Sequence, residues 1–309
     1  MKHKNIVEVI DFNQDEWKKL INLSLKYKKN KNLTPKKLNK KRIGLLFDNN
    51  SLRTRLSFET AIYLLGGDSY FVDIHNLTHE KDGTPRESYE DIIETADRML
   101  DAYVLRDYSQ KMLEVFKRKN NPPFINGFCQ IGHPSQALAD LSVIKWKKKK
   151  YNDLNYVCVC PSKGSGVMES FIYAVLLLGQ KISVITETGK FIGKNKDFWE
   201  QANKLIKKYN GNITITKNLT ETIKQADVLY VDEWWEDNKN YLKKNIGKYK
   251  IDINALLGNK KDLVIMHCLP AHYDREITKE VIYSPQSIIL DQAEFRVYSA
   301  MSLLNYLVS

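Results

Sequence analysis

Short apolar runs rich in β-branched residues alternate with helical patterns from about residue 42 to the end of the chain. This alternation predicts parallel strands joined by crossover helices, because two adjacent parallel strands need a long return connection. The runs before residue 130 are 43–47, 70–72, 102–105 and 123–125, and those after residue 150 are 156–160, 182–185, 213–215, 228–231, 263–266 and 288–290. Two groups of runs indicate an α/β fold with two doubly wound parallel-sheet domains of similar size, joined by helices.

A lysine-rich segment, Lys145-Trp146-Lys147-Lys148-Lys149-Lys150, separates the two groups. Such a charged helix end cannot join a core and is typical of a surface boundary between domains. We therefore expect a first domain over residues 1–145 and a second over residues 150–288, a division that suits a length of 309 residues. Apolar residues at helical spacing between Ala293 and Leu307 predict a C-terminal helix, over residues 292–309, that packs back on the first domain.

The composition is that of a globular protein, with 43% hydrophobic and 28% charged residues. No window approaches eighteen uncharged apolar residues, and the segment after Met1 contains no apolar stretch typical of a secretory signal. We expect a cytoplasmic protein with no membrane partner. The net charge of +11 comes mostly from scattered lysines, which indicates solvated faces and attraction for a small phosphorylated substrate rather than nucleic-acid binding.

The four cysteines, Cys129, Cys158, Cys160 and Cys268, include no pair with the two-residue spacing of a zinc knuckle or a redox motif. Cys158 and Cys160 alternate within a predicted strand, so their side chains point to one face of the sheet. We interpret them as buried core thiols rather than as part of a disulfide framework.

A candidate anion site follows the first predicted strand. The residues after 43–47 are Asp48-Asn49-Asn50, and Ser51-Leu52-Arg53-Thr54-Arg55 then begins a helix. In a strand-loop-helix unit the first free amides of the helix favour an anion, and the arginines and hydroxyls add donors that a phosphate accepts. A capped helix with Ser51 as N-cap and exposed arginines is the simpler alternative for this segment alone.

The segment Ser51-Leu52-Arg53-Thr54-Arg55 closely resembles the Ser-Thr-Arg-Thr-Arg motif of the aspartate and ornithine carbamoyltransferase family, with Leu52 in place of Thr. Further segments match in the same order: His133-Pro134-Ser135-Gln136, His267-Cys268-Leu269-Pro270-Ala271-His272 and Glu294-Phe295-Arg296, together with Arg86-Glu87-Ser88 and Arg106. The resemblance spans nearly the whole chain and is nearest to the ornithine branch. It implies an enzyme that moves the carbamoyl group of carbamoyl phosphate to an amine, without a metal or cofactor.

The resemblance also implies which residues act. The carbamoyl phosphate-binding residues would be Ser51, Leu52, Arg53, Thr54, Arg106, His133, Gln136, Cys268, Leu269 and Arg296. Of these, Thr54, Arg106, His133 and Cys268 would be catalytic. Thr54, Arg106 and His133 would donate to the carbonyl oxygen, where donors act most strongly on the charge that develops in the tetrahedral intermediate. Gln136 and the backbone carbonyls near Cys268 and Leu269 would accept from the carbamoyl NH2. The departing phosphate itself can take the proton of the amine.

Sites in this family are completed by a loop from a neighbouring subunit of a trimer, which corresponds here to residues 79–88. Lys81 and Arg86 are the candidates to reach the phosphate, so a homotrimer is expected. Asp82 stands where the ornithine branch often has Gln, which places an anion near an anionic ligand.

The residues expected to bind the acceptor diverge from the ornithine pattern. Glu169 replaces an Asn, and the loop Asp232-Glu233-Trp234-Trp235-Glu236-Asp237-Asn238 keeps only Asp and Trp of Asp-x-Trp-x-Ser-Met-Gly. Glu169, Glu236 and Asp237 would repel an α-carboxylate, whereas Asp232 and the two tryptophans suit a cation. We therefore expect a diamine, a guanidino-amine or an ornithine-like acceptor.

Three alternatives remain open. The first alternative is a true ornithine carbamoyltransferase. The second is a catalytically silent relative that serves as a binding or regulatory protein. Against the second stand five retained residues: Arg53, Thr54, Arg106, His133 and Gln136. A dinucleotide-binding oxidoreductase is also doubly wound, but Pro161-Ser162-Lys163-Gly164-Ser165-Gly166 lacks the full glycine fingerprint.

Overall fold

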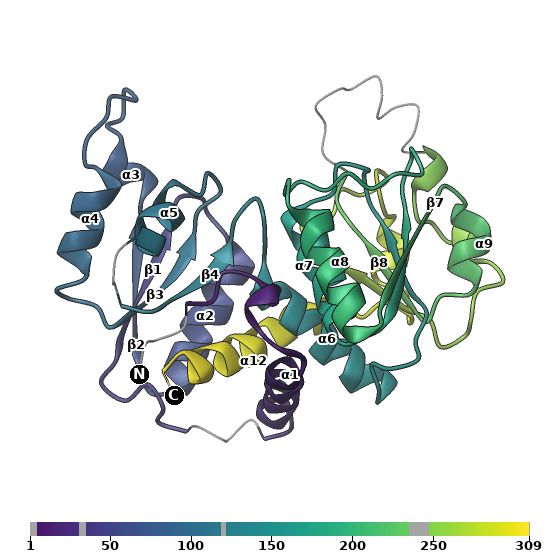
Figure 1. Ribbon diagram of the computed structural model, residues 1–309, viewed down its shortest axis with the longest axis horizontal. Coiled ribbons are helices and arrows are strands. Elements are labelled where there is room, and N and C mark those ends of the chain that lie inside the picture. The colour runs from purple at the N-terminus through teal and green to yellow at the C-terminus, as the bar shows by residue number, and fades with distance from the viewer. Residues whose placement is uncertain (1–4, 31–34, 119–121, 235–246, 309) are drawn as a thin grey trace. The chain divides into compact units, whose positions relative to one another are not determined.

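The computed structural model describes residues 5–30, 35–118, 122–234 and 247–308 (Figure 1). The chain divides into two compact units, each with its own parallel sheet. Unit 1 comprises Met1–Ser142 and Glu294–Ser309, and unit 2 comprises Val143–Ala293. By sequence, helices α6 (Pro134–Lys148) and α12 (Ile289–Leu307) each run from one unit into the other.

The sheet of unit 1 has four parallel strands in the order β2-β1-β3-β4. Its strands are β1 (Arg42–Phe47), β2 (Asp68–Asp73), β3 (Ala102–Arg106) and β4 (Phe124–Phe128). Neighbouring β1 and β3 connect in opposite directions along the sheet, which makes their carboxyl ends the topological switch point where α/β sheets bind ligands.

Helices cover both faces of this sheet. They are α1 (Gln14–Lys29), α2 (Leu52–Leu64), α3 (His75–Thr78), α4 (Tyr89–Ala96) and α5 (Lys111–Arg118), with the 3-10 turn η1 (Val9–Asp11). The buried apolar side chains of α4 and α5 pack on the face that carries Leu46, Tyr103 and Leu105. On the other face lies α2, and Figure 1 shows α12 alongside α1 and α2. Lys28 of α1 donates to Glu294 of α12 at 2.7 Å, so this part of the C-terminal helix belongs to unit 1.

The sheet of unit 2 has five parallel strands in the order β7-β6-β5-β8-β9. They are β5 (Tyr156–Val159), β6 (Lys181–Ile185), β7 (Asn212–Thr216), β8 (Val228–Val231) and β9 (Val264–His267). Its helical elements are α7 (Gly166–Leu177), α8 (Phe198–Tyr209), α9 (Leu219–Lys224), η2 (Asn254–Leu256) and α11 (Lys279–Ile282). Every residue of α7 is buried, because this helix lies between the sheet and α8. The switch point of this sheet lies between β5 and β8.

The predicted α/β fold with two parallel-sheet domains is confirmed, and each predicted strand except the last is present. The strand predicted at 288–290 is wrong, because Ile289 begins α12 and only Ser287 forms a bridge with Ile265. A three-residue apolar run fits either period, and here it belongs to the helical pattern that continues to Leu307. The C-terminal helix therefore begins earlier than residue 292.

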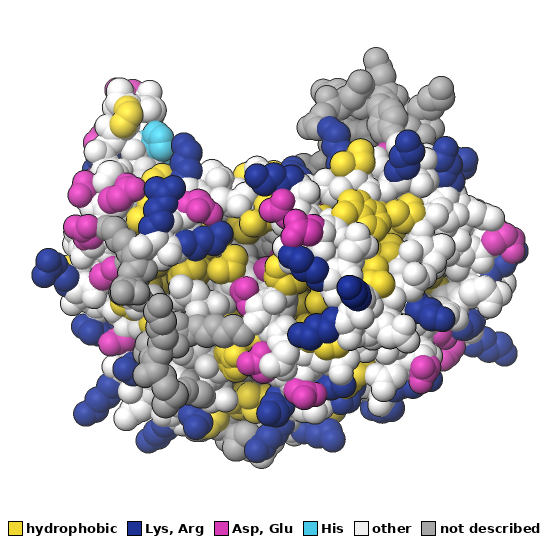
Figure 2. All heavy atoms as spheres, in the orientation of Figure 1, with side chains coloured by type: hydrophobic (Ala, Val, Ile, Leu, Met, Phe, Trp, Pro, Cys, Tyr) yellow, Lys and Arg dark blue, Asp and Glu magenta, His cyan; other side chains and the backbone are white. Residues whose placement is uncertain are grey.

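The burial of the cysteines and the distribution of charged side chains agree with the predictions from the sequence. The side chains of Cys158 and Cys160 are buried and are not joined in a disulfide, as predicted for core thiols. On the face drawn in Figure 2, Lys and Arg side chains are scattered among uncharged and acidic side chains over both units. Among the described residues, no helix combines the length and the apolar character that crossing a bilayer requires.

Candidate active site

The switch point of unit 1 brings together the two segments that were predicted to hold an anion. Arg106, the last residue of β3, is the register partner of Phe47, the last residue of β1, and the loop to Ser51 begins there. The register between β3 and β4 shifts at Leu105/Arg106. Leu105 pairs with Asn126 and Arg106 with Phe128, so the extra residue, Gly127, lies on β4 and brings Phe128 opposite Arg106.

The amino end of α2 separates the side chains of the arginine-rich motif. Ser51 caps the helix by accepting from the Thr54 amide at 3.3 Å, and Thr54 is 1% exposed, whereas Leu52 is 69% exposed. Arg55 lies away from the other candidates, because its Nε donates to Glu59 at 2.9 Å and its guanidinium stacks on Phe71. Of the two arginines in the motif, Arg53 and not Arg55 is close enough to Arg106 and His133 to lower their pKa values.

Arg106 is a half-buried guanidinium close to another cation. Its Cζ lies 4.4 Å from the centre of the Phe128 ring, which fixes the plane of the group. Burial, opposed by the charge of Asp48 and assisted by the charge of Arg53, lowers the pKa of Arg106 to about 10. The Nε of Arg106 has no hydrogen-bond partner among the described residues. A preoriented cation with an unused donor is suited to an anionic ligand.

His133 stands immediately before α6 and is 4% exposed. Its ring meets Phe128 edge to face, and its Nδ1 and the Ser135 Oγ are hydrogen-bonded at 3.3 Å. Burial lowers the pKa of His133 well below its usual value, and the charges of Arg296, Arg106 and Arg53 lower it further. The imidazole is therefore neutral at pH 7. With Ser135 as donor to Nδ1, its proton lies on Nε2, the position from which it can donate to a ligand oxygen.

Arg296 of α12 connects this helix to α6 and α2 beside His133. It is 2% exposed, its Nη1 donates to Gln136 Oε1, and its Nη2 donates to Thr54 Oγ1 at 3.2 Å. Gln136 in turn donates from Nε2 to Asp140 at 2.8 Å, one turn further along α6. This network fixes the Gln136 amide and the Thr54 hydroxyl in single orientations. The C-terminal helix thus supplies a cation to a site whose other residues lie far away in sequence.

Unit 1 therefore brings together four groups that can donate hydrogen bonds to an anion. They are close enough to shift one another's pKa values: Arg53, Arg106, His133 and Arg296. Like charges held together cost free energy until an anion neutralises them, so this arrangement favours a phosphate-sized dianion. Within the residues described, no cluster of three or more His, Cys, Asp or Glu side chains is arranged to hold a metal.

The depressed pKa of His133 predicts how stability depends on pH. Below the ordinary value of 6.5 the unfolded chain binds a proton that the folded chain does not, so stability falls as the pH drops through 6.5. This group alone contributes a slope of up to about 1.4 kcal/mol per pH unit. Urea unfolding between pH 5 and 8 should show a shallower slope for His133→Gln. The exposed His75→Gln variant is the control, and equal slopes for His133→Gln and the wild type would contradict the prediction.

The loop expected to reach a neighbouring subunit lies between α3 and α4. Asp82 closes its turn, because its carboxylate accepts from the Thr84 amide at 3.0 Å and the Thr84 hydroxyl at 2.8 Å, and both bonds lower its pKa. Gly83 follows with a φ of +86°, which suits glycine. Asp82 therefore stabilises the local turn through its hydrogen bonds to Thr84. Arg86 is exposed and lies 3.7 Å from Glu80, and Lys81 is exposed as well.

In unit 2, Glu169 is completely buried at the amino end of α7. Its carboxylate accepts from the amides of Lys194 and Asn195, in the loop that follows β6. Burial raises the pKa of Glu169 to about 7, against the lowering effect of these hydrogen bonds. The residue expected to contact the acceptor thus also holds a loop, and its charge changes near neutral pH.

Asp232 follows β8 at the switch point of unit 2 and is 2% exposed. It accepts from the hydroxyl of Ser165, the N-cap of α7, at 2.7 Å. Burial raises the pKa of Asp232, and the Ser165 hydrogen bond opposes that shift. Loops after β5 and β8 are therefore tied together where a ligand of this sheet would bind.

Two further carboxyl groups, which were not predicted from the sequence, accompany Asp232. Glu233 lies 3.0 Å from His272 Nδ1, and burial followed by the charges of Glu276 and Asp232 raises its pKa to about 7. Glu276 is 1% exposed, hydrogen-bonds to His267 Nε2 at 3.2 Å and accepts from the His272 amide at 2.7 Å. The only sequence signal was the proximity of Glu276 to the His-Cys-Leu-Pro segment.

The segment after β9 is held by these contacts. His267 Nδ1 accepts from the Leu269 amide at 2.9 Å, which places the ring proton on Nε2 for Glu276. Cys268 is partly exposed, and the Leu269–Pro270 peptide is cis. The turn that carries Cys268 and Leu269 is therefore anchored through His267 to the buried carboxylate of Glu276.

The expected stacking of Trp234 on a ligand cation is wrong. Trp234 is 1% exposed and stacks on Tyr249 with ring centres 5.7 Å apart, so its indole belongs to the core of unit 2. Trp235, Glu236 and Asp237, which were also expected near the acceptor, lie outside the described residues.

Similarity to known proteins covers the whole chain. Residues 4–146 match the family model "Aspartate/ornithine carbamoyltransferase, carbamoyl-P binding domain", and residues 152–307 match "Aspartate/ornithine carbamoyltransferase, Asp/Orn binding domain". The chain is 32% identical to the catabolic ornithine carbamoyltransferase of Thermoplasma volcanium over 100% of both chains. It is 35% identical to the ornithine carbamoyltransferase of Methanococcus aeolicus over 94% of both.

Solved structures agree with these matches. The anabolic ornithine carbamoyltransferase of Campylobacter jejuni superposes with a TM-score of 0.87 at 28% identity, over 98% of this chain and 99% of that one. The ornithine carbamoyltransferase of Pyrococcus furiosus gives 0.86 at 27% identity, over 98% and 96%. The chain therefore belongs to the aspartate/ornithine carbamoyltransferase family and is an enzyme that transfers carbamoyl groups.

Proposed function

We propose that this enzyme transfers the carbamoyl group of carbamoyl phosphate to a primary amine that carries a second cationic group. The acceptor is inferred from four buried carboxyl groups in unit 2, which belong to Glu169, Asp232, Glu233 and Glu276. A cationic group is the natural partner of such a set, whereas a carboxylate would be repelled.

Carbamoyl phosphate, the donor of the carbamoyl group, would bind to residues of unit 1. The phosphate of carbamoyl phosphate would neutralise Arg53 and Arg296, and the Thr54 hydroxyl and the Leu52 amide would hold it at the amino end of α2. Arg106 and neutral His133 would donate to the carbonyl oxygen, on which negative charge develops when the amine attacks. The C–N bond then forms, the C–O bond to phosphate breaks, and the departing phosphate takes the proton of the amine.

Other residues would hold the carbamoyl nitrogen. Gln136 is fixed by Arg296 and Asp140, and its carbonyl oxygen is the acceptor for the carbamoyl NH2 in this scheme. The backbone carbonyls near Cys268 and Leu269 would accept as well. Because Glu276 and His267 anchor that turn, they would act as positioning residues.

Ornithine is the second candidate acceptor, and the names of the relatives favour it. Its α-carboxylate would have to approach Glu169, which is compatible only with the protonated form of that side chain. With a pKa of about 7, Glu169 is mainly ionised at pH 8 and mainly neutral at pH 6. The two candidates thus differ in how they should respond to pH.

An amine panel tests the acceptor. At pH 8 we expect kcat/KM for butane-1,4-diamine or 4-guanidinobutylamine to exceed that for ornithine by about tenfold or more, the effect of one unfavourable charge contact of about 1.4 kcal/mol. Glu169→Asn should move the preference toward ornithine, and the exposed Glu200→Gln serves as control. Saturable ornithine carbamoylation with no turnover of either cationic amine would refute the proposal.

The same ratio should depend on pH. As the pH falls from 8 to 6, Glu169 becomes neutral and repulsion of an α-carboxylate decreases, so kcat/KM for ornithine relative to the diamine should rise. Protonation of the attacking amine affects both substrates and largely cancels in the ratio. In Glu169→Asn the ratio should depend less steeply on pH, and the dependence that remains would come from Glu233, whose pKa is also raised to about 7. Equal pH dependence of the ratio in the wild type and in Glu169→Asn would remove Glu169 from acceptor selection.

We further propose that three subunits assemble and complete one another's sites. Leu52, Leu56 and Tyr63 are exposed on one face of α2, and Tyr70 is exposed on the edge strand β2. Beside the Ser51 loop lies a cavity of about 330 Å³ whose lining includes Asp48 and Asp73. Lys81 or Arg86 of a neighbouring subunit would have suitable charge for this cavity.

Light scattering coupled to size exclusion tests the assembly. We expect a mass three times the chain mass of 36.0 kDa. Leu56→Glu should reduce the mass toward that of one chain, because it places a charge in an apolar contact, and should lower activity with it. Leu290→Glu, at an exposed leucine of α12, is the matched control. A wild-type enzyme that is active as a monomer would exclude the shared site.

A further inference from the structure

Unit 2 contains a cavity of about 540 Å³ at the end of its sheet opposite Asp232 and His267. Its walls are the last turn of α6, the segment that enters β5, and the residues just before β8 and β9. Because all three strands are parallel, these segments lie at one edge, the amino edge of the sheet. The volume is in the range of sites that hold small metabolites.

Lysines dominate the charged lining of this cavity. Lys147, Lys148, Lys150 and Lys261 line it, together with Asp153, Asp227 and Asp262. Lys147 and Lys148 are in the last turn of α6, where positive charge complements the helix dipole, so their presence alone indicates no ligand. Lys150 and Lys261 lie outside any helix and have no such use.

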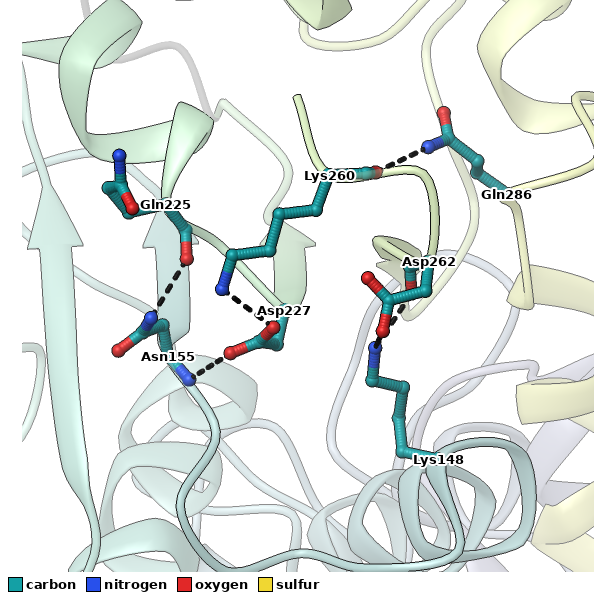
Figure 3. Close-up of polar contacts among 7 residues, drawn as sticks. All are labelled: Lys148, Asn155, Gln225, Asp227, Lys260, Asp262 and Gln286. Atoms are coloured by element: carbon teal, nitrogen blue, oxygen red, sulfur yellow. Dashed lines mark hydrogen bonds and ion pairs between the residues drawn. The ribbon is translucent and has the colours of Figure 1, made fainter. Parts of the chain in front are cut away.

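Two of the aspartates are already neutralised. Figure 3 shows Lys148 Nζ bound to Asp262, at 2.6 Å from Oδ2 and 2.7 Å from the carbonyl oxygen. It also shows Lys260 Nζ at 2.8 Å from Asp227, whose other oxygen accepts from the Asn155 amide at 2.8 Å. Lys150 and Lys261, by contrast, have no ion-pair partner among the residues that the structure describes.

The rest of the lining is apolar or carries neutral donors. Leu154, Leu263 and Ile288 form part of the wall, and Ser287 and Gln286 add a hydroxyl and an amide. The Gln286 side chain is held in place, because its Nε2 donates to the carbonyl of Lys260 at 3.1 Å (Figure 3). The wall also includes Asp153, which forms no ion pair among the described residues, so the unneutralised charge is two lysines against one aspartate. A wall with apolar and neutral polar parts and a net positive charge suits a molecule with an apolar body and anionic groups.

We propose that this cavity is a regulatory site for a small organic anion, a carboxylate or phosphate ester with an apolar part, and that Lys150 and Lys261 bind its anionic groups. The site is separate from the carbamoyl phosphate residues of unit 1 and from the carboxyl groups proposed to select the acceptor.

The elements around the cavity give such a ligand a route to the reaction. Helix α6 ends at the cavity and has His133 and Gln136 at its other end. Strand β9 begins at the cavity and ends at His267, roughly 10 Å away at the rise of a parallel strand. Asp291, which binds Lys147 at 2.7 Å, lies on α12 five residues before Arg296. A ligand that shifts α6, β9 or α12 would act on residues of both substrate sites.

Calorimetric titration of the full-length enzyme tests the site. Phenylsuccinate and uridine monophosphate are the probes for the carboxylate and the phosphate ester, and saturating carbamoyl phosphate is present to occupy the site in unit 1. We expect at least one probe to bind saturably, and Lys150→Gln/Lys261→Gln to weaken that binding by about tenfold or more, because two charge-assisted hydrogen bonds are lost. The matched control is Lys181→Gln/Lys207→Gln, which removes two exposed lysines of unit 2.

Initial rates provide the second readout. The bound probe should change the KM for carbamoyl phosphate on the order of fivefold in the wild type and leave Lys150→Gln/Lys261→Gln unaffected, with equal rates in the absence of probe. No saturable binding below roughly 10 mM, or equal affinity in the wild type and the double variant, would overturn the site. Binding without any change in rate would overturn its regulatory role. The calorimetric result does not depend on which amine is the acceptor.

Discussion

Replacing Arg106 with alanine is expected to lower kcat about 10²–10³-fold, the effect of removing one donor from a developing oxyanion. The guanidinium lies at the end of β3, its plane is fixed by Phe128, and its Nε has no partner among the described residues. The fold should tolerate the change, because Arg106 makes no ion pair with a described residue, and the loss of its attraction to Asp48 is offset in part by relief of the repulsion from Arg53. Steady-state kinetics with saturating amine and varied carbamoyl phosphate would measure the loss.

Two further variants make the result specific. Arg106→Lys keeps the charge but loses the planar stack on Phe128, so it should restore only part of the rate. Arg118→Ala, at an exposed position at the end of α5, should have wild-type kinetics. If kcat for Arg106→Ala were unchanged, Arg106 would have no part in stabilising the transition state.

Replacing Arg296 with alanine is expected to reduce kcat/KM for carbamoyl phosphate by a similar factor, about 10²–10³-fold, through a different route. Arg296 supplies charge to the anion and also holds Gln136 and Thr54 in place. Without the anion, its loss removes the hydrogen bonds to Gln136 and Thr54 but also relieves repulsion among cations, so the free energy of unfolding should fall by only about 1–2 kcal/mol.

Unfolding with and without carbamoyl phosphate separates these effects. The ligand should stabilise the wild type strongly and the Arg296→Ala variant much less, because ligand stabilisation follows affinity. The charge of Arg296 also helps to lower the pKa of His133, so that pKa should rise in the variant and the acid limb of the pH–rate profile should move to higher pH. Leu290→Ala, at an exposed position on the same helix, is the control. Equal stabilisation by the ligand in variant and wild type would show that Arg296 does not contact the anion.

Regular patterns made most of the fold predictable. Strands such as Val228–Val231 are continuous apolar runs because both faces of a parallel sheet are covered by helices. The same reliance on apolar runs caused the error at 288–290, because a run of three apolar residues is too short to distinguish a strand from a helix. The capping of α2 by Ser51 was also readable, because a hydroxyl before a helical pattern is a local signal.

The candidate site was predictable only where one short segment contains the signal. Arg53 and Arg55 are two residues apart and equivalent in sequence, yet Glu59 and Phe71 hold Arg55 away from the site. Glu169 was recognised as an unusual residue, but its hydrogen bonds to Lys194 and Asn195 join α7 to a loop 25 residues away. Glu276 and Glu233 were missed, because their proximity to Asp232 arises only when β8 and β9 pair.

The sequence by itself determined the fold class, the family and the residue types available for a phosphate, since each depends on local patterns or on motifs in order. The tertiary structure alone decided which charges meet. It placed Arg296 of the last helix beside Thr54 and Gln136, and it buried His133 among three arginines so that its imidazole is neutral. Electrostatic energies depend on distance and burial, and both follow from the packing of segments far apart in the chain.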